Sequence, residues 1–413
     1  MRERVEETAA PALAGSRMAG PTLARLLPPP RPAPDLEVLR FRTNLFAPLH
    51  DFEPSSGKGR FDALLLPGPG LLKITVRVSF RFISGRRPGD DPFPGVQGVE
   101  ASEYVWSQGE QDVYKRRYLT EIAPQWSGKF SLASTRQPDD VWQGVTVTPI
   151  VGVVEDDLRP HAVLEIHKRP SDVQPVTNFV RRREPGKPLE TYFTSDAMEL
   201  DSEMDDPINE KSIQITKVHF KRGKTELDDR GKGELAPILA KLTADPALRV
   251  MLRGRASSDR KAGTTAEEGF KLNFRLSRER SQAVAAELAA AGVAADRILQ
   301  RNWGDSGTTF DEDNCRVDVS IVSHQARQGA AHEFGHILGL GDEYGYSDIP
   351  GAQPGDPLRD EEYVRMVKEQ TGYDLRRTSD ESMMSKGATI RPWHYAPFLE
   401  ALKRIAGPTW RLR

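Results

Sequence analysis

The 413-residue sequence predicts an α+β protein, on three observations. Residues 72–82 alternate apolar and polar side chains with the period of two that marks a half-buried strand. Residues 213–322 alternate strand-like and helix-like stretches. Residues 332–336 place two histidines four positions apart, the spacing of one helix face. Strands and helices in this order predict packed layers rather than a helical bundle.

The N-terminal segment, residues 1–34, is predicted to be disordered. It ends in the sequence PPPRPAP, which indicates a stiff polyproline-like linker. Its first residues carry charges but no continuous apolar stretch, so we expect no signal peptide, synthesis in the cytoplasm, and a non-classical route for any export. No run of 18 apolar residues occurs, so we expect no membrane span.

Composition narrows the function classes. A net charge of −2 with 29% charged residues argues against a protein that binds nucleic acid or a membrane surface. The single cysteine, Cys315, excludes an intramolecular disulfide framework. The length leaves room for two or three domains.

Residues 35–211 are predicted to be β-rich, with one helix. The strands are expected at residues 72–82, 144–154 and 161–167. The helix is expected where large side chains fall four positions apart, at Tyr114, Tyr118, Ile122 and Trp126. Residues 169–211 are rich in Pro, Arg, Asp and Glu and are predicted to be a loop. His161 and His167 are interpreted as ordinary strand residues rather than metal ligands, because no carboxylate partner is evident beside them.

Residues 212–324 have a βαβαβ pattern. The strands are expected at residues 213–220, 248–254 and 316–322, and the helices at residues 231–243 and 273–291. The second helix carries Leu276, Val284 and Leu288 on one face. The segment resembles the OmpA-like domain, a peptidoglycan-binding module. The matching residues are Phe220, residues 254–257, Asn273, Leu276, Ser277, Arg280 and residues 314–317.

This resemblance implies a peptidoglycan site. In the family, an Asp after a strand and a helix Arg hold the carboxylate and amine of diaminopimelate. Arg280 fits the second role, because a guanidinium is a natural bidentate partner of a carboxylate. Ser257 stands in place of the Asp, with Asp259 two residues later, and Asn273 completes the candidate set. The alternative is an OmpA-like fold used as a spacer or assembly module.

Residues 332–344, HEFGHILGLGDEY, predict a catalytic zinc site. On a helix, His332 and His336 share a face and can bind one metal ion. Glu333 then lies beside the metal, where a general base for a metal-bound water belongs. Gly339 permits a sharp turn at the helix end, which returns Asp342 as the third ligand. Three protein ligands and an open fourth position are the catalytic zinc pattern.

The zinc segment resembles the extended signature of the metzincin peptidases, in the snapalysin-like variant whose third ligand is Asp. The sequence MMSKG at residues 383–387 resembles the Met-turn of that clan, with Met384 aligning best. The alternative for these methionines is that they simply fill the core. The resemblance implies a zinc endopeptidase that acts on a peptide or protein. It also implies a twisted sheet whose edge strand holds the substrate.

The domain order follows from this resemblance. Metzincin-like peptidases place a sheet and a helix before the zinc helix, and residues 325–413 are too few to supply them. We expect residues 35–211 to provide this part of the peptidase domain, with the OmpA-like segment inserted between the two parts. The alternative is three sequential domains with an unrelated β module first.

The last segment holds further candidates. A helix is expected at residues 356–373, and a terminal helix carries Phe398, Leu399, Leu402 and Ile405. Between them, Tyr395 is a candidate donor to the transition-state oxyanion and His394 a candidate alternative ligand or acid. Packing is the alternative for both. Glu343 competes with Asp342 as third ligand, and the spacing favours Asp342.

The expected function is therefore zinc-dependent endopeptidase, with Glu333 activating a zinc-bound water, a pH optimum at or above neutral, and an OmpA-like module for cell-wall binding or assembly. One alternative is a non-catalytic envelope or assembly protein with a latent zinc site. The other is an accessory of a contractile injection particle, because the zinc motif, Met-turn and Trp-His pair resemble proteins associated with such particles.

Overall fold

The computed structural model describes residues 36–43, 46–85, 98–136, 140–170, 172, 179–181, 187–198, 200–201, 215–257, 263–305, 312–322, 327–343, 360–376, 381–385 and 387–413. The predicted N-terminal tail and Asp259 lie outside these residues. Within them, no helix is long and apolar enough to cross a membrane.

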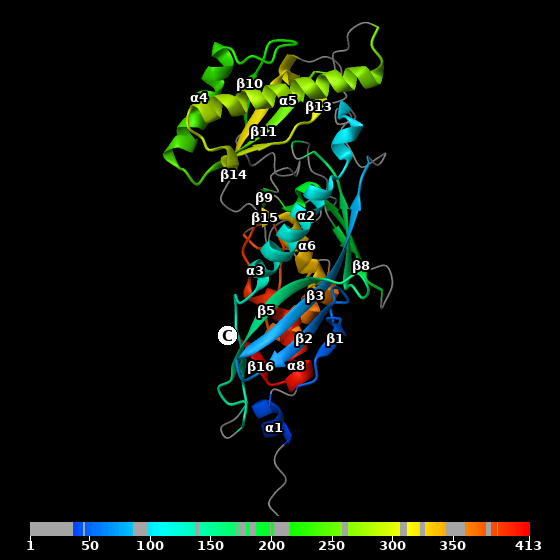
Figure 1. Cartoon of the computed structure of the whole chain (residues 1–413). Coiled ribbons are helices and arrows are strands. Elements are labelled where there is room, and N and C mark those ends of the chain that lie inside the picture. The colour runs from blue at the N-terminus through cyan, green and yellow to red at the C-terminus, as the bar shows by residue number, and fades with distance from the viewer. Residues whose placement is uncertain are drawn as a thin grey trace, which may run out of the picture.

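The larger sheet has nine strands among the described residues and the order β16-β4-β5-β3-β6-β8-β7, with β2 on β3 and β1 on β2 (Figure 1). Its strands are β1 (Leu49–Phe52), β2 (Phe61–Leu66), β3 (Leu71–Ile83), β4 (Leu132–Ser134), β5 (Thr146–Glu155), β6 (Ala162–His167), β7 (Phe179–Arg181), β8 (Leu189–Thr194) and β16 (Trp410–Leu412). β3 is parallel to β5 and β6, and β6 is parallel to β8. The edge strand β7 runs antiparallel to β8.

The long strand β3 forms as its alternation predicts. Leu72, Ile74, Val76 and Val78 are fully buried, while the residues between them are at least partly exposed. Burying each aliphatic side chain contributes roughly 1.5–3 kcal/mol. β3 is therefore the strand around which the sheet is built.

The helices that cover this sheet come from both ends of the chain. They are α1 (Leu36–Thr43), α2 (Gln108–Arg117), the π-helical turn η3 (Tyr118–Ile122), α3 (Ala123–Trp126), α6 (Gly329–Ile337), α7 (Glu361–Thr371), the 3₁₀ turn η8 (Pro392–Tyr395) and α8 (Ala396–Ala406). The predicted helical row of Tyr114, Tyr118, Ile122 and Trp126 is confirmed, and all four side chains are buried.

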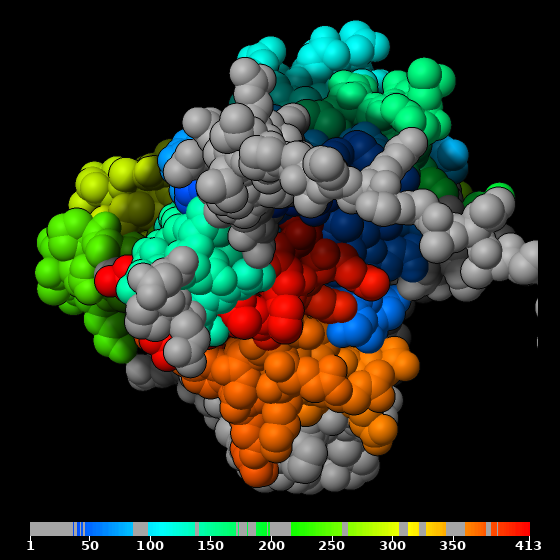
Figure 2. Space-filling view, turned by 90° about the horizontal axis from the view of Figure 1, so that it is seen from below, coloured from blue at the N-terminus to red at the C-terminus, as the bar shows by residue number. Residues whose placement is uncertain are grey.

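One hydrophobic core joins the two distant parts of the sequence. Its buried residues come from 52–198 and from 330–410. The indole of Trp126 donates to the carbonyl of Ala331 at 3.0 Å, and the rings of Phe61 and Phe398 are 5.9 Å apart. Figure 2 shows C-terminal residues in red lying beside N-terminal residues in blue on one face.

The second sheet, with its own core, lies between these two parts in sequence. Its order is β10-β14-β11-β12, with β13 also on β11. The elements are β10 (Ile215–His219), α4 (Asp229–Ala244), β11 (Arg249–Ala256), α5 (Ala266–Ala290), β12 (Ile298–Gln300), β13 (Gly304–Asp305) and β14 (Arg316–Val322). The predicted strands and helices are confirmed, and β12 and β13 were missed. Val284 and Leu288 are buried as predicted, while Leu276 is only partly buried.

The chain enters and leaves this second unit at adjacent positions. β9 (Leu200–Asp201) pairs antiparallel with β15 (Arg327–Gln328), so that Leu200 lies opposite Gln328. The amide of Gln328 also donates to the carbonyl of Met198 at 3.0 Å and to the carboxylate of Glu121 at 3.1 Å. The two connections therefore form one short ribbon on the larger unit.

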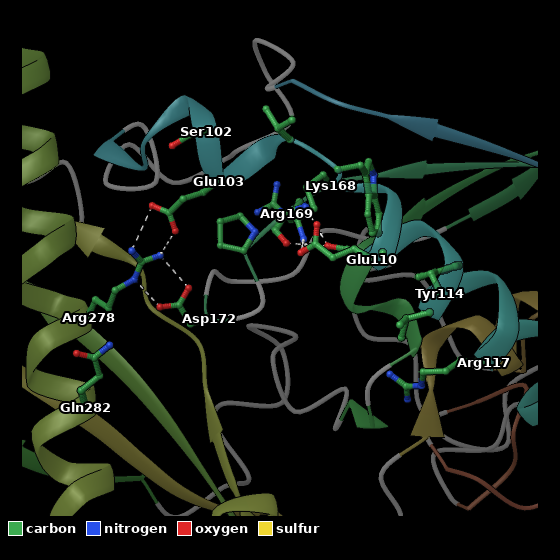
Figure 3. A pocket seen from close by; sticks show the side chains of 16 residues that line it. Ser102, Glu103, Glu110, Tyr114, Arg117, Lys168, Arg169, Asp172, Arg278 and Gln282 are labelled. Atoms are coloured by element: carbon green, nitrogen blue, oxygen red, sulfur yellow. Dashed lines mark hydrogen bonds and ion pairs between the residues drawn. The ribbon is translucent and has the colours of Figure 1, made fainter.

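A clamp docks the second unit on the first. The guanidinium of Arg278 on α5 donates to Glu103 at 2.9 Å and, in bidentate fashion, to Asp172 at 2.5 and 2.9 Å. Beside this clamp, Phe274 packs with Val99 and Tyr104 in a small apolar cluster. Figure 3 shows Arg278 between the two carboxylates. Paired bidentate contacts of this kind fix orientation as well as adding energy.

One sequence prediction about the fold was wrong. Residues 169–211, predicted as a loop, contain β7, β8 and β9. β8 is an interior strand whose Leu189, Thr191 and Phe193 are buried. The strand is short and its flanks are rich in charge and Pro, so its alternation was obscured; parallel pairing with β6 stabilises it.

Candidate metal centre

Helix α6 carries the HExxH residues and lies within the core. His332 is 2% exposed and Glu333 6% exposed, so the motif occupies the inner face of the helix. Gly335 allows two large neighbours to approach. A Cβ there would lie 2.3 Å from the sulfur of Met384 and 2.9 Å from the ring of Trp126. The glycine in the motif is thus a packing requirement.

The turn after α6 is held by the loop between β1 and β2. Gly339 has a φ of +101°, as the sequence predicts for a left-handed turn. The hydroxyl of Ser56 donates to the carbonyl of Gly339 at 2.8 Å, and the amide of Arg60 donates to the carbonyl of Ile337 at 2.9 Å. A Cβ on Gly59 would lie 2.2 Å from the amide nitrogen of Gly339. The sequence did not predict that this loop contacts the turn, because Ser56 and Gly339 are 283 positions apart.

The three predicted ligands converge. The Nε2 atoms of His332 and His336 lie 3.2 and 3.3 Å from one oxygen of Asp342. Zinc–ligand bonds of about 2.0–2.1 Å at tetrahedral angles place neighbouring ligand atoms about 3.3 Å apart. The two distances from histidine to Asp342 therefore fit a tetrahedral zinc ion.

The histidine tautomers fit as well. Nδ1 of His332 lies 2.8 Å from the carbonyl oxygen of Met383, and Nδ1 of His336 lies 2.9 Å from that of Leu340. A carbonyl only accepts, so each Nδ1 carries a proton, and a ring that loses its second proton keeps the lone pair on Nε2, the atom nearest Asp342. Metal-binding histidines are usually oriented in this way.

The electrostatics favour a cation at this point. Burial lowers the pKa of His336, but Asp342 and Glu333 more than offset that effect and raise it to about 9. Ligand atoms of Glu333, His332 and His336 all lie within 4.8 Å of one another. Glu333 is thus beside the converging donors, where the predicted base belongs.

The predicted Met-turn lies directly under the helix. Met384 is fully buried, and its sulfur faces Gly335. The backbone of the turn also binds the site, because the Met383 carbonyl accepts from His332 and the Met384 carbonyl accepts from the amide of Glu343 at 2.8 Å.

The carboxylate of Glu343 points away from the candidate metal ligands, so Asp342 stays the favoured third ligand. Its fully buried carboxylate accepts hydrogen bonds from Tyr363, Ser382, Trp393 and His394. Burial raises its pKa, but His394 and the other donors reverse that effect and lower it. Sequence reasoning missed Tyr363 and Ser382, because no spacing links them to the motif.

The roles suggested for His394 and Tyr395 do not fit the structure. Nδ1 of His394 accepts from the amide of Arg391 at 3.1 Å, so its Nε2 carries a proton and donates to Glu343 at 3.0 Å. The hydroxyl of Tyr395 donates to the carbonyl of Trp126 at 2.6 Å and accepts from the amide of Lys129 at 2.8 Å. Both side chains are buried, and their polar atoms are already hydrogen-bonded to these partners.

A second group of possible ligands, formed by Asp51, Asp62 and His161, occurs among the described residues. Both carboxylates lie 3.4 Å from Nε2 of His161, so the expectation that no carboxylate lies near this histidine was wrong. The tautomer is the opposite of that at the first site. Nδ1 of His161 accepts from the amide of Arg77 at 3.0 Å, which leaves the proton on Nε2. The guanidinium of Arg77 already bridges the two carboxylates, so this group does not suit a metal.

The candidate peptidoglycan residues are buried. Ser257, Asn273 and Arg280 are 5%, 2% and 1% exposed. Arg280 donates to the carbonyls of Lys224 and Arg255 at 3.0 Å each. The predicted role of Arg280 as an accessible carboxylate clamp is therefore not the one it has in this conformation.

A cleft of about 770 Å³ lies between the two units, beside the Arg278 clamp (Figure 3). Its lining is of mixed charge, with Glu103, Glu110 and Asp172 beside Arg117, Lys168, Arg169 and Arg278. None of the converging zinc-site residues lines it. The cleft and the candidate metal centre are thus separate features.

Comparisons with known proteins concern the second unit. Similar solved structures include the OmpA-like domain of FopA1 from Francisella tularensis subsp. tularensis SCHU S4, 24% identical, covering 27% of this chain and 73% of that one, TM-score 0.23. The peptidoglycan-associated lipoprotein from Burkholderia pseudomallei is 19% identical, covering 29% and 98%, TM-score 0.23. The periplasmic domain of Helicobacter pylori MotB is 16% identical, covering 26% and 75%, TM-score 0.22. Among curated proteins, none matches this chain. Residues 219–320 match the OmpA family, so an OmpA-like domain forms the central segment of this chain.

Proposed function

We propose that this protein is a zinc-dependent endopeptidase whose catalytic domain is built from the segments on either side of its OmpA-like domain. The observation that carries this proposal is the convergence of His332, His336 and Asp342. Nε2 of each histidine lies at zinc-ligand spacing from the same oxygen of Asp342, and the Nδ1 hydrogen bonds leave Nε2 of each ring as the atom that can bind a metal.

In the proposed reaction, a bound zinc ion and Glu333 would have separate roles. A bound zinc ion supplies Lewis acidity toward a carbonyl oxygen and makes water more acidic. Glu333, one residue after a ligand, takes the proton from the attacking water and passes it to the amine that leaves. Structural zinc needs no such carboxylate beside it, so Glu333 favours catalysis over a purely structural site.

The strand order also supports a metzincin-like catalytic domain. β5, β3, β6 and β8 are mutually parallel neighbours, and β7 is an antiparallel edge strand that contacts α6. An exposed strand edge can bind an extended peptide by adding a strand. In the proposal, β7 holds the substrate beside the metal centre, and the ribbon of β9 and β15 marks where the OmpA-like domain is inserted.

The OmpA-like domain suggests a second activity, binding of peptidoglycan, because the family match covers residues 219–320, from the last residue of β10 into β14. In the proposal this domain brings the catalytic unit to cell wall. Ser257 in place of Asp and the internal bonds of Arg280 predict weaker recognition of diaminopimelate than the intact family site would give.

The proposal is tested by incubating the purified chain and zinc with a mixed library of protein peptides and peptidoglycan stem peptides, and reading cleavage by mass spectrometry. Wild-type cleavage that a chelator and Glu333→Gln both abolish is the expected result, and the cleaved peptides identify the substrate class. A chain that binds one zinc ion but cleaves nothing in either library would favour a non-catalytic assembly protein or an accessory of an injection particle.

A further inference from the structure

We infer that Glu343 is a positioning residue for the metal centre, acting through Asp342 and the turn at Met383 and Met384; this inference rests on the proposed function. Glu343 follows the ligand Asp342 directly in sequence. Any displacement of its backbone is therefore passed to the ligand.

The carboxylate of Glu343 accepts hydrogen bonds from four donors on three parts of the chain. Tyr363 on α7 donates at 3.0 Å and Trp393 on η8 donates at 2.7 Å, both to Oε1. His394, also on η8, donates to Oε1 at 3.0 Å. Ser382, in the turn beneath the zinc helix, donates to Oε2 at 2.6 Å. The loop after α6 is thus tied to three other parts of the C-terminal segment.

The same residue is joined to the metal centre through the backbone. Its amide donates to the carbonyl of Met384 at 2.8 Å, and the neighbouring carbonyl, that of Met383, accepts from Nδ1 of His332. Ser382 begins this turn and is held by the carboxylate. Glu343 therefore fixes both Asp342 and the carbonyl that sets the tautomer of His332.

Both side-chain oxygens at position 343 must accept hydrogen bonds, so a side chain that only fills the same volume cannot replace Glu343. All four partners present a hydrogen to the carboxylate, and the side chain is fully buried. Glutamine has the same shape but replaces one acceptor oxygen with an amide NH2 group, a donor that would face another donor. A buried donor left without an acceptor costs about 1–3 kcal/mol, so the four-donor arrangement would rearrange.

The test is the affinity for Zn²⁺, measured by competition with a chromogenic chelator, together with the absorption spectrum of the Co²⁺-loaded chain. Glu343→Gln is expected to weaken zinc binding by roughly 10–100-fold and to alter the cobalt spectrum, the scale seen for residues that orient metal ligands. Tyr363→Phe, which removes one donor of four, is expected to weaken it by a smaller factor.

Tyr395→Phe is the matched control, because it removes a buried hydroxyl donor from the same segment without touching Glu343. It is expected to lower the melting temperature while leaving zinc affinity unchanged. If Glu343→Gln binds zinc as the wild type does, the inference is overturned, since a packing role alone would survive this isosteric change.

If Glu343→Gln does not fold, Tyr363→Phe decides: equal zinc affinity in Tyr363→Phe and Tyr395→Phe would overturn the inference. A wild-type chain that binds no zinc would instead overturn the proposed function and the inference together, so the two failures are distinguishable.

Discussion

Nδ1 of His332 and the carbonyl oxygen of Met383 are 2.8 Å apart, although 51 positions separate them in sequence. This hydrogen bond joins the zinc helix to the methionine turn below it. The tautomer of a candidate ligand is thereby decided by a loop that is distant in sequence.

The contact between helix and turn leaves no room at Gly335. We predict that Gly335→Ala destabilises the protein by about 1–3 kcal/mol, because its Cβ would overlap Met384 and Trp126. Gly233→Ala in α4 is the control, since nothing lies within 4 Å of its Cβ, and it should stabilise by about 0.5–1 kcal/mol. Urea unfolding followed by tryptophan fluorescence measures both. Equal effects of the two changes would disprove the packing argument.

The ribbon at Leu200 and Gln328 predicts that the OmpA-like domain can be removed. Because these residues already lie opposite each other, replacing residues 202–326 with a short Asn-Gly turn should leave the larger core folded. Circular dichroism and a cooperative thermal transition check this. Full-length Arg278→Ala serves as the control for losing the interdomain clamp alone. A shortened chain that is unfolded, beside a folded Arg278→Ala, would argue against insertion.

The buried His161 predicts a pH-dependent stability. Burial, followed by Arg77, lowers its pKa from 6.5 to about 4, with Asp62 and Asp51 opposing the shift. Below about pH 6.5 His161 becomes protonated in the unfolded chain but stays neutral in the folded chain. The free energy of unfolding therefore falls as the pH drops toward 4. At about 1.4 kcal/mol per pKa unit, the loss approaches roughly 3 kcal/mol.

Unfolding free energies measured from pH 7 to pH 5 check this, with His161→Gln as the control that cannot gain a proton. The variant should show a flatter profile than the wild type over this range. Identical slopes would mean that His161 does not cause the dependence.

The OmpA-like domain predicts a gain of binding. Ser257→Asp restores the carboxylate that the family places there, so we expect more of the full-length chain to co-sediment with peptidoglycan containing diaminopimelate. Arg280→Ala in the same background should remove the gain, because the amine and carboxylate contacts act together. If Ser257→Asp binds no better than the wild type, the buried position of Ser257 rules the site out.

The sequence predicted features set by neighbouring residues better than features that depend on contacts between distant segments. The helical spacing of His332 and His336 and the turn at Gly339 place Asp342 beside the histidines by local geometry alone, and this was readable from the residues. β8 was not, since parallel pairing with β6 stabilises a short strand that its own composition barely marks. The loop at Ser56 and Gly59 was also hidden, because it acts on the helix end only after the two parts of the chain share a core.

The same division explains why the partners of three buried side chains could not be predicted from the sequence. Tyr395 and His394 have the chemistry of catalytic groups, and only their hydrogen-bond partners show that both are committed elsewhere. His161 was judged to be without carboxylates because Asp51 and Asp62 are about a hundred residues away in sequence. The fold decides which groups contact each of these side chains, and the spacing of residues in the sequence does not show it.

The most direct measurement is the zinc content of the purified full-length chain and of two histidine variants. We predict one zinc ion per chain, retained in His161→Ala and lost in His332→Ala, because Nδ1 of both histidines on α6 is hydrogen-bonded to a carbonyl and leaves Nε2 for the metal, whereas His161 has the opposite tautomer. Zinc retained in His332→Ala, or lost in His161→Ala, would contradict the assignment of the metal centre.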